Sequence, residues 1–412
     1  MLLAQLALIA LGAATAAEVK SLSDAEKLLA KSGELSAADA EAIAKYLRPR
    51  TPKADQNRGG GRRPIVQKYA VGFVQPAAPT AKCEIRTRDG HTVPLRSLGD
   101  SGLHAAIRTF PNFTGIDFQY FIDGKRVGQG QAQIEEYDLP PDCLPKPDVP
   151  KGEVIKMPPW TDSKIFPGTK RDWWVYVPKQ YDASKPAALF VFQDGGSYVE
   201  GDQVPVVLDN LIAAKKIPVM IGVFINPGAG RSRGDEYDTC TPRYAEFLEN
   251  EILPEVARKY KFSSDPKLRA IGGASSGASC AFTAAWHRPD LFGRVLSHIG
   301  SYCDFRGLPN YPTPDGKSKP APSEFGPWKT AHDYPPLIRK TRPVKPIRVF
   351  LQDGRRDLDN QLGNWPLANE QMAAALRFSG YKCKFVMGEG FHNHKHGRAL
   401  LPESLVWLWS DE

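Results

Sequence analysis

The chain has 412 residues, of which 42% are hydrophobic and 24% are charged, so it can bury one large core or two cores of moderate size. We expect two domains with additional segments. The net charge of +8 is spread along the chain with one dense cluster at 58–63, which indicates a soluble surface and a solvated linker, and we expect no nucleic-acid partner.

The N-terminal segment is typical of an export signal. Its sequence, MLLAQLALIALGAATAAEVK, holds an apolar run too short to span a bilayer, followed by small residues in the A-x-A pattern. We expect a signal peptide over residues 1–17 and a secreted or periplasmic protein. No Lys or Arg precedes the apolar run, which leaves an uncleaved anchor or a misplaced start codon as alternatives. No later segment resembles a transmembrane helix, so we expect no integral membrane domain.

The six cysteines do not follow a metal-binding or redox pattern. None of them forms C-x-x-C or C-x-x-C-H, which argues against zinc-ribbon, thioredoxin and c-type haem sites. A disulfide is plausible in an oxidising compartment, but the sequence does not indicate which cysteines would pair.

Residues 18–64 predict a helical hairpin and a linker. The stretch SDAEKLLAKSGELSAADAEAIAKYL has plausible N-caps and apolar residues at helical spacing, interrupted at Gly33. The following RPRTPKADQNRGGGRRP is rich in Pro, Gly and Arg and has no apolar periodicity. This composition predicts a flexible linker that leaves the two helices free to move.

Residues 65–148 predict a small Ig-like β-sandwich. Short alternating runs such as KCEIRTR and IDFQYFIDG are accompanied by Asp-Gly turns at Asp89-Gly90 and Asp123-Gly124.

Residues 149–412 predict an α/β domain. Apolar strands such as AALFVFQDG and PVMIGVFINPG alternate with helices such as VPVVLDNLIAAKK and YAEFLENEILPEVARKY. This order predicts a mostly parallel central sheet covered by helices, with its chemistry at the carboxyl ends of the strands. Residues 304–343 form a long Pro-rich insertion in this domain.

A nucleophile elbow is predicted at Gly273-Ala274-Ser275-Ser276-Gly277. This G-x-S-x-G pattern lies between the strand KLRAIGG and the helix ASCAFTAAWHRP, which is the context that a nucleophile elbow requires. The spacing places Ser275 at the apex as the nucleophile. Ser276 is the rival nucleophile, but its position suits the donation of a backbone N–H.

A serine hydroxyl needs a base held by an acid, and both should follow in the order Ser, Asp or Glu, His. We assign the acid to Asp357, shortly after the strand PIRVFLQDG, with Asp353 and Asp359 as alternatives. We assign the base to His392, the first histidine after the strand KCKFVMGEG.

The histidine cluster permits a metal-binding alternative. His392, His394 and His396 alternate and would share one face of an extended segment. The preceding Gly388 and Gly390 argue for a loop, and a serine mechanism accounts for one histidine without a metal. We therefore expect no metal and no cofactor.

Other groups around the site follow earlier strand ends. Gly195 and Gly196, in the DGGS turn after AALFVF, allow close backbone approach, so we assign the oxyanion-hole donors to one of them and to Ser276. An ordinary Gly-Gly turn is the alternative. Trp365 lies beside the proposed acid and would line the substrate cleft, with core packing as an equal alternative.

Together these residues resemble the esterase D branch of α/β-hydrolases. The chain is similar to enterochelin-esterase-like proteins and to the feruloyl and acetyl-xylan esterases of carbohydrate esterase family one. The resemblance rests on blocks such as LFVFQDGG, IGGASSGASCAFTAAWHRPDLFG, VFLQDGRRDLDN and GEGFHNHKHG. It implies an α/β-hydrolase domain after a small β-sandwich, with Ser275, Asp357 and His392 as nucleophile, acid and base. Two departures, Phe391 where a glycine commonly stands and the insertion 304–343, affect the expected acyl pocket.

These features predict a serine carboxylic-ester hydrolase that acts through an acyl-enzyme. The expected partner is a small-molecule or polysaccharide-linked ester, with siderophore esters in the same class by analogy. An acyltransferase of the same fold and a catalytically inactive glycan-binding protein are the alternatives.

Overall fold

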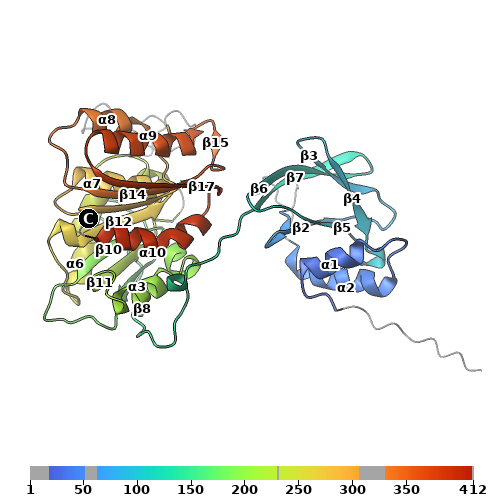
Figure 1. Ribbon diagram of the computed structural model, residues 1–412, viewed down its shortest axis with the longest axis horizontal. Coiled ribbons are helices and arrows are strands. Elements are labelled where there is room, and N and C mark those ends of the chain that lie inside the picture. Colours follow the sequence, from blue (N-terminus) through green and yellow to red (C-terminus); the bar gives the residue numbers. More distant parts are fainter. Residues whose placement is uncertain (1–17, 52–62, 230–231, 306–329, 411–412) are drawn as a thin grey trace, which may run out of the picture. The chain divides into compact units, whose positions relative to one another are not determined.

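The computed structural model describes residues 18–51, 63–229, 232–305 and 330–410 (Figure 1). The chain divides into two compact units, Met1–Glu136 and Tyr137–Glu412, so the division falls earlier than the boundary at 148 expected from the sequence. The expected export signal, nearly all of the Gly-rich part of the linker and most of the insertion 304–343 lie outside the described residues. Within the described ranges, every helix is too short or too polar to cross a membrane.

The first unit begins with two helices, α1 (Leu22–Leu29) and α2 (Ala37–Leu47). Each starts at a serine, Ser21 or Ser36, whose side chain accepts a hydrogen bond from the backbone N–H three residues later. Apolar residues of both helices are buried in one cluster with the sheet of this unit, including Ile43, Leu47 and Ile107. The prediction that these helices move freely is therefore wrong, because their apolar stripe has a sheet face to cover.

The strands of the first unit form one antiparallel sheet. Among the described residues it has seven strands in the order β1-β2-β5-β4-β3-β6-β7. The predicted Asp-Gly turns join β3 to β4 and β6 to β7, and the Phe73 ring of β2 packs edge-on against Phe118 of β6 with ring centroids 5.0 Å apart. A separate two-sheet sandwich of Ig type stays a prediction. The strands are β1 (Ile65–Gln67), β2 (Ala70–Pro76), β3 (Cys83–Thr87), β4 (Thr92–Ser97), β5 (Leu103–Thr109), β6 (Thr114–Ile122) and β7 (Lys125–Ile134).

The second unit is built on a sheet of eight strands within the described ranges, in the order β17-β14-β13-β12-β10-β11-β9-β8. The pairings from β17 to β11 are parallel, and β9 and β8 are added antiparallel at one edge. The strands are β8 (Glu153–Lys156), β9 (Trp173–Val177), β10 (Ala188–Gln193), β11 (Met220–Ile225), β12 (Arg269–Ala274), β13 (Arg294–His298), β14 (Arg348–Gly354) and β17 (Lys382–Gly388), with a small separate pair β15 (Asp359–Asn360) and β16 (Gly363–Asn364).

Helices cover both faces of this sheet, which gives three layers (Figure 1). Alternate residues of β10 face opposite ways: Leu189 and Val191 join the core with α4 to α9, whereas Phe190 and Phe192 join the core with α3 and α10. The helices are α3 (Val204–Ala213), α4 (Ser232–Tyr237), α5 (Arg243–Phe247), α6 (Leu253–Ala257), α7 (Ser276–His287), α8 (Tyr334–Lys340), α9 (Trp365–Phe378) and α10 (Lys395–Trp409).

The strand order reverses between β10 and β12. From β10 the chain adds β11 on one side and then returns to place β12 on the other side. Loops that leave the carboxyl ends of two such strands diverge, which opens a crevice where open α/β sheets bind their ligands. The elbow that follows β12 and the Gly-Gly turn that follows β10 both lie at this position.

Candidate active site

The turn between β12 and α7 holds Ser275 in a strained backbone conformation. Its φ and ψ are 57° and −126°, which residues other than glycine rarely adopt. The Ser275 N–H donates to the carbonyl of His298 at 3.0 Å, which fixes the turn to the neighbouring strand β13. A Cβ on Gly273 would lie only 2.5 Å from the carbonyl carbon of Gly277. This sharp turn is the predicted elbow, with Ser275 at its apex.

The structure brings Ser275, His392 and Asp357 into one hydrogen-bonded series. His392 Nε2 lies 2.9 Å from Ser275 Oγ, and His392 Nδ1 lies 2.6 Å from Asp357 Oδ1. The three residues follow β12, β17 and β14, so the parallel sheet places them at one edge. Burial lowers the pKa of His392 to about 4, so its ring is neutral near pH 7 and can accept a proton.

The rival residues occupy other places. Ser276 is buried as the first residue of α7, where its N–H has no acceptor four residues earlier in the helix. Asp359 is exposed in the short strand β15, away from the hydrogen bonds of His392. Asp353 is wholly buried at the end of β14, where it contacts the Asp357 carboxyl.

The three histidines of the cluster point to different partners. His394 Nδ1 bonds Asp202 Oδ2 at 2.7 Å, and His396 Nδ1 lies 2.9 Å from Gln352 Nε2. Among the residues that the structure describes, no three His, Cys, Asp or Glu side chains form a possible metal site. All six cysteines are free thiols, so the plausible disulfide is absent from the structure.

The turn after β10 approaches the elbow closely. A Cβ on Gly195 would lie 2.3 Å from the backbone N of Ile225, so only glycine fits there. The Gly196 N–H donates to Asn226 Oδ1 at 2.9 Å. Because that hydrogen bond engages the Gly196 amide, we favour Gly195 of the two alternatives, and the oxyanion donors stay a prediction.

Asp194 connects this turn to the elbow and to α4. Its φ is 51°, its N–H donates to the Tyr237 hydroxyl at 3.2 Å, and its two carboxylate oxygens accept from Arg233 at 2.9 and 2.8 Å. One of these oxygens would lie 2.9 Å from a Cβ on Gly277. The turn that contains Gly195 is therefore held beside the elbow by the contacts of Asp194 with Tyr237 and Arg233.

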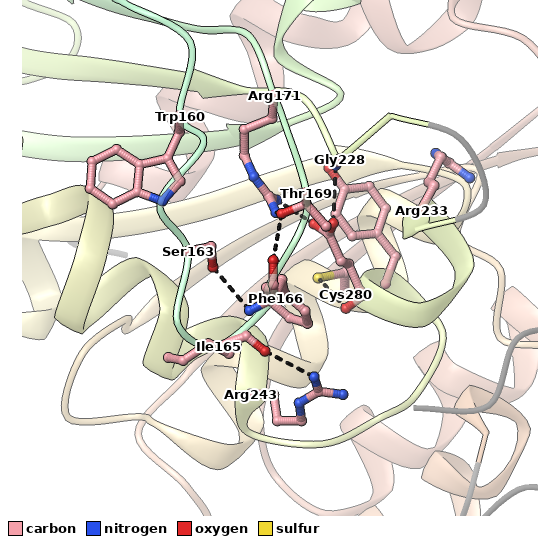
Figure 2. Close-up of polar contacts among 12 residues, drawn as sticks. Trp160, Ser163, Ile165, Phe166, Thr169, Arg171, Gly228, Arg233, Arg243 and Cys280 are labelled. Atoms are coloured by element: carbon pink, nitrogen blue, oxygen red, sulfur yellow. Dashed lines mark hydrogen bonds and ion pairs between the residues drawn. The ribbon is translucent and has the colours of Figure 1, made fainter. Parts of the chain in front are cut away.

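A buried ion pair anchors α4 in turn. Arg171 donates to Glu236, and both side chains are fully buried. Glu236 also accepts from the Gly228 N–H at 3.0 Å, and Arg171 donates to Thr169 Oγ1 at 2.7 Å. Figure 2 shows Arg171 directed at Thr169, with Gly228 beside them. Because Arg233 lies on the same helix as Glu236, this pair supports the contact with Asp194 indirectly.

Trp365 and Ser301 pack behind the serine and histidine. The Trp365 indole N–H donates to Ser301 Oγ at 3.2 Å, and Ser301 Oγ lies 3.1 Å from Ser275 Oγ. The Trp365 ring packs edge-on against His392 with ring centroids 5.7 Å apart, and the residue is only 2% exposed. Because little of its surface faces solvent, its position fits the core-packing alternative. A role in substrate binding stays a prediction.

Sequence reasoning missed Ser301 and Arg233. Ser301 follows β13, whose carboxyl end lies at the same edge of the sheet. Arg233 follows β11 in the segment RSRGDEY, whose charges gave no periodic signal. The position of Ser301 shortly after the carboxyl end of β13 is a signal for it, whereas Arg233 lies inside α4, well beyond the end of β11, and the sequence carries no signal for it.

Comparison with known proteins places the second unit in a family. The family described as "Putative esterase" matches residues 163–408. The iron(III) enterobactin esterase of Dickeya dadantii is 27% identical over 239 residues, which cover 58% of this chain and 52% of that protein. The chain spans about half the length of the curated relatives that it matches.

Solved structures share the fold. The enterochelin esterase of Shigella flexneri matches with a TM-score of 0.58 and 17% identity, over 83% of this chain and 92% of that chain. A ferulic acid esterase matches with a TM-score of 0.50 and 21% identity, over 63% of this chain and 98% of that chain. These matches show an α/β-hydrolase-like fold, and the resemblance inferred from the sequence is confirmed.

Proposed function

We propose, from the premise that this chain belongs to that esterase family, that it hydrolyses carboxylic esters through an acyl-enzyme formed on Ser275. The observation that carries the proposal is the continuous hydrogen-bonded series from Ser275 Oγ through His392 to Asp357. A hydroxyl, an imidazole and a carboxylate in this order have the geometry that activates a serine nucleophile.

In the first half-reaction, Ser275 Oγ attacks the ester carbonyl while its proton passes to His392 Nε2. The Asp357 carboxylate holds the Nδ1–H of the ring and stabilises the imidazolium that forms. The negative charge that develops on the carbonyl oxygen is stabilised by the backbone N–H groups of Gly195 and Ser276. His392 then donates its proton to the leaving alcohol, and the acyl group stays on Ser275.

In the second half-reaction, water attacks the acyl-enzyme carbonyl. His392 accepts a proton from the water, the bond from the acyl carbon to Ser275 Oγ breaks, and the proton returns to the serine. The product is the free carboxylic acid. Every group that transfers a proton in this cycle is a side chain of the chain itself or the substrate water.

The similar proteins suggest which esters to test. Iron(III) enterobactin esterases support a siderophore ester, and the ferulic acid esterase supports a feruloyl ester. We propose that the substrate belongs to one of these two classes of ester. The geometry of Ser275, His392 and Asp357 suits either ester equally, so substrate choice depends on residues outside these three.

Turnover of an ester panel tests the proposal. Purified protein is assayed on p-nitrophenyl acetate, p-nitrophenyl butyrate, a feruloyl ester and a catecholate serine ester, beside Ser275→Ala and the matched control Ser276→Ala. We expect Ser275→Ala to lower kcat by about 10⁴-fold or more. Ser276→Ala should keep most activity, because its proposed contribution is a backbone N–H. Full activity in Ser275→Ala, or loss of activity on chelation, would refute the serine mechanism.

A further inference from the structure

A second carboxyl group lies behind the proposed acid. Asp353, the second-to-last residue of β14, is 0% exposed, and its carboxyl lies against the Asp357 carboxyl. Its Oδ1 accepts the Gly354 N–H at 2.7 Å, and its Oδ2 accepts from Asn369 Nδ2 at 2.8 Å. The series at the active site therefore continues one residue further, from serine to histidine to Asp357 to Asp353.

Two carboxyl groups in direct contact cannot both be ionised, because like charges at hydrogen-bonding distance repel strongly in a buried site. A hydrogen bond between them also needs one proton, since an ionised carboxylate only accepts. The proton belongs on Asp353, because Asp357 contacts the imidazole that becomes positive during the reaction.

Among the residues that the structure describes, the titratable groups that face Asp353 carry no positive charge near neutral pH. Burial lowers the pKa of His392 to about 4 and lowers the pKa of His396, which contacts the Asp353 backbone, so both rings are neutral. Burial raises the pKa of Cys303, which also faces Asp353, to about 12. Burial, and then the contact with Asp357, raise the pKa of Asp353 far above its ordinary value.

We propose that Asp353 is a positioning residue that stays protonated and donates its carboxyl proton to Asp357, which holds the Asp357 carboxylate against His392 with one negative charge shared by the pair. This inference rests on the role proposed above for Asp357. When alkaline pH removes the proton from Asp353, the two carboxylates repel, Asp357 leaves its position, and ester turnover falls.

The isosteric variant Asp353→Asn tests the donated hydrogen bond separately from the titration of Asp353. In Asp353→Asn the carbonyl oxygen can still accept the Gly354 N–H, and the amide N–H₂ can donate to Asp357 without titrating. The substitution removes the hydrogen bond from Asn369, whose amide also donates to the carbonyls of Gly300 and Trp365. Asp353→Asn should therefore fold, whereas Asp353→Ala removes the donor to Asp357 and opens a small buried space.

The kinetic test compares Asp353→Asn and Asp353→Ala with the matched control Asp359→Asn, an exposed acid of the same loop. We expect Asp353→Asn to lower kcat at pH 7 less than Asp353→Ala does, and to lose the alkaline fall in kcat between pH 8 and 10. Asp353→Ala should lower kcat by up to about 100-fold with KM little changed, because Asp357 is no longer held in place. Asp359→Asn should change neither kcat nor the pH profile.

Three outcomes would overturn the inference: Asp353→Ala with unchanged kcat, Asp353→Asn as impaired as Asp353→Ala, or an alkaline fall that persists in Asp353→Asn. If Asp353→Ala does not fold, the pH profile of Asp353→Asn decides alone.

The urea midpoint of unfolding supplies a readout that does not need ester turnover. A carboxyl whose pKa is raised in the folded state binds a proton that the unfolded chain releases, so its contribution to stability falls as pH rises from about 4 toward the folded pKa. We expect the urea midpoint of Asp353→Asn, measured relative to that of the unchanged protein, to increase from pH 6 to pH 9. A constant difference would refute a held proton. If this gain is seen while no ester is turned over, the proposed function fails and the proton assignment stands.

Discussion

Removing the carboxylate of the buried pair Arg171–Glu236 should cost a large part of the stability of the second unit. Both side chains are 0% exposed, so Glu236→Ala leaves the Arg171 guanidinium in the interior without its counter-charge. Breaking a buried pair from one side typically costs about 3–5 kcal/mol. The Gly228 N–H also loses its acceptor, at a cost of about 1 kcal/mol. We therefore expect a loss of about 4–6 kcal/mol, against a total stability of about 5–15 kcal/mol for a typical domain.

Two matched variants separate the parts of this loss. Glu236→Gln keeps an oxygen for the Gly228 N–H but removes the charge, so it should cost less than Glu236→Ala. The double variant Arg171→Met/Glu236→Ala removes both charges and should be more stable than Glu236→Ala alone. If the double variant is the less stable of the two, desolvated charge is not the cause.

Tryptophan fluorescence during urea unfolding reports this loss selectively. All eight tryptophans of the sequence lie in the unit Tyr137–Glu412, so the signal follows that unit. A loss below about 1 kcal/mol for Glu236→Ala would contradict the reasoning, since such a value is typical of an exposed pair. Folded Glu236→Ala protein should also hydrolyse esters more slowly, because α4 holds Arg233 in contact with Asp194.

Three further outcomes follow from the geometry of the site. Arg233→Ala frees the Asp194 carboxylate, and we expect kcat to fall about tenfold or more with KM little changed; an unchanged kcat in steady-state assays would refute the role of this pair. Because His392 must be neutral to accept a proton, kcat/KM should rise with pH through about 4 and then stay level until the alkaline fall proposed for Asp353, and a rising midpoint near 7 would contradict the buried ring. Gly273→Ala places a Cβ 2.5 Å from the Gly277 backbone, so urea unfolding should show a loss of about 1–3 kcal/mol, and equal stability would show that the turn can relax.

The hydrogen-bonded order of Ser275, His392 and Asp357 could be predicted from the sequence because each residue follows a strand whose apolar pattern is clear. Strands that lie parallel in one sheet bring their carboxyl ends to one edge, so Ser275, Asp357 and His392 meet although they are distant in sequence. Of the three histidines, the first one after β17, His392, is the one that hydrogen-bonds Ser275 and Asp357. His394 and His396 could not be assigned, since their partners Asp202 and Gln352 come from other elements.

The supporting contacts could not be predicted because they depend on side-chain directions. Gly195 and Gly196 are equal in the sequence, and only the position of Asn226 distinguishes their amides. Asp353 and Asp357 were alternatives for one role, whereas the structure gives each a different place in the same series. The packing of the N-terminal helices was missed because the Gly-rich linker indicates freedom while the apolar stripe of α2 indicates a partner.

Gly273 and Gly277, the two glycines of the elbow, are each required by a different neighbouring group. Neither of them has a positive φ. Ser275 carries the φ of 57°, and Gly273 is needed because its Cβ would meet the Gly277 backbone. Gly277 is needed for another reason, since a Cβ there would lie 2.9 Å from Asp194 Oδ2. The second glycine therefore leaves room for the turn after β10 to lie close against the elbow. The G-x-S-x-G pattern of this chain therefore serves two purposes. Gly273 permits the sharp turn, and Gly277 permits the contact with Asp194, the acid that follows β10.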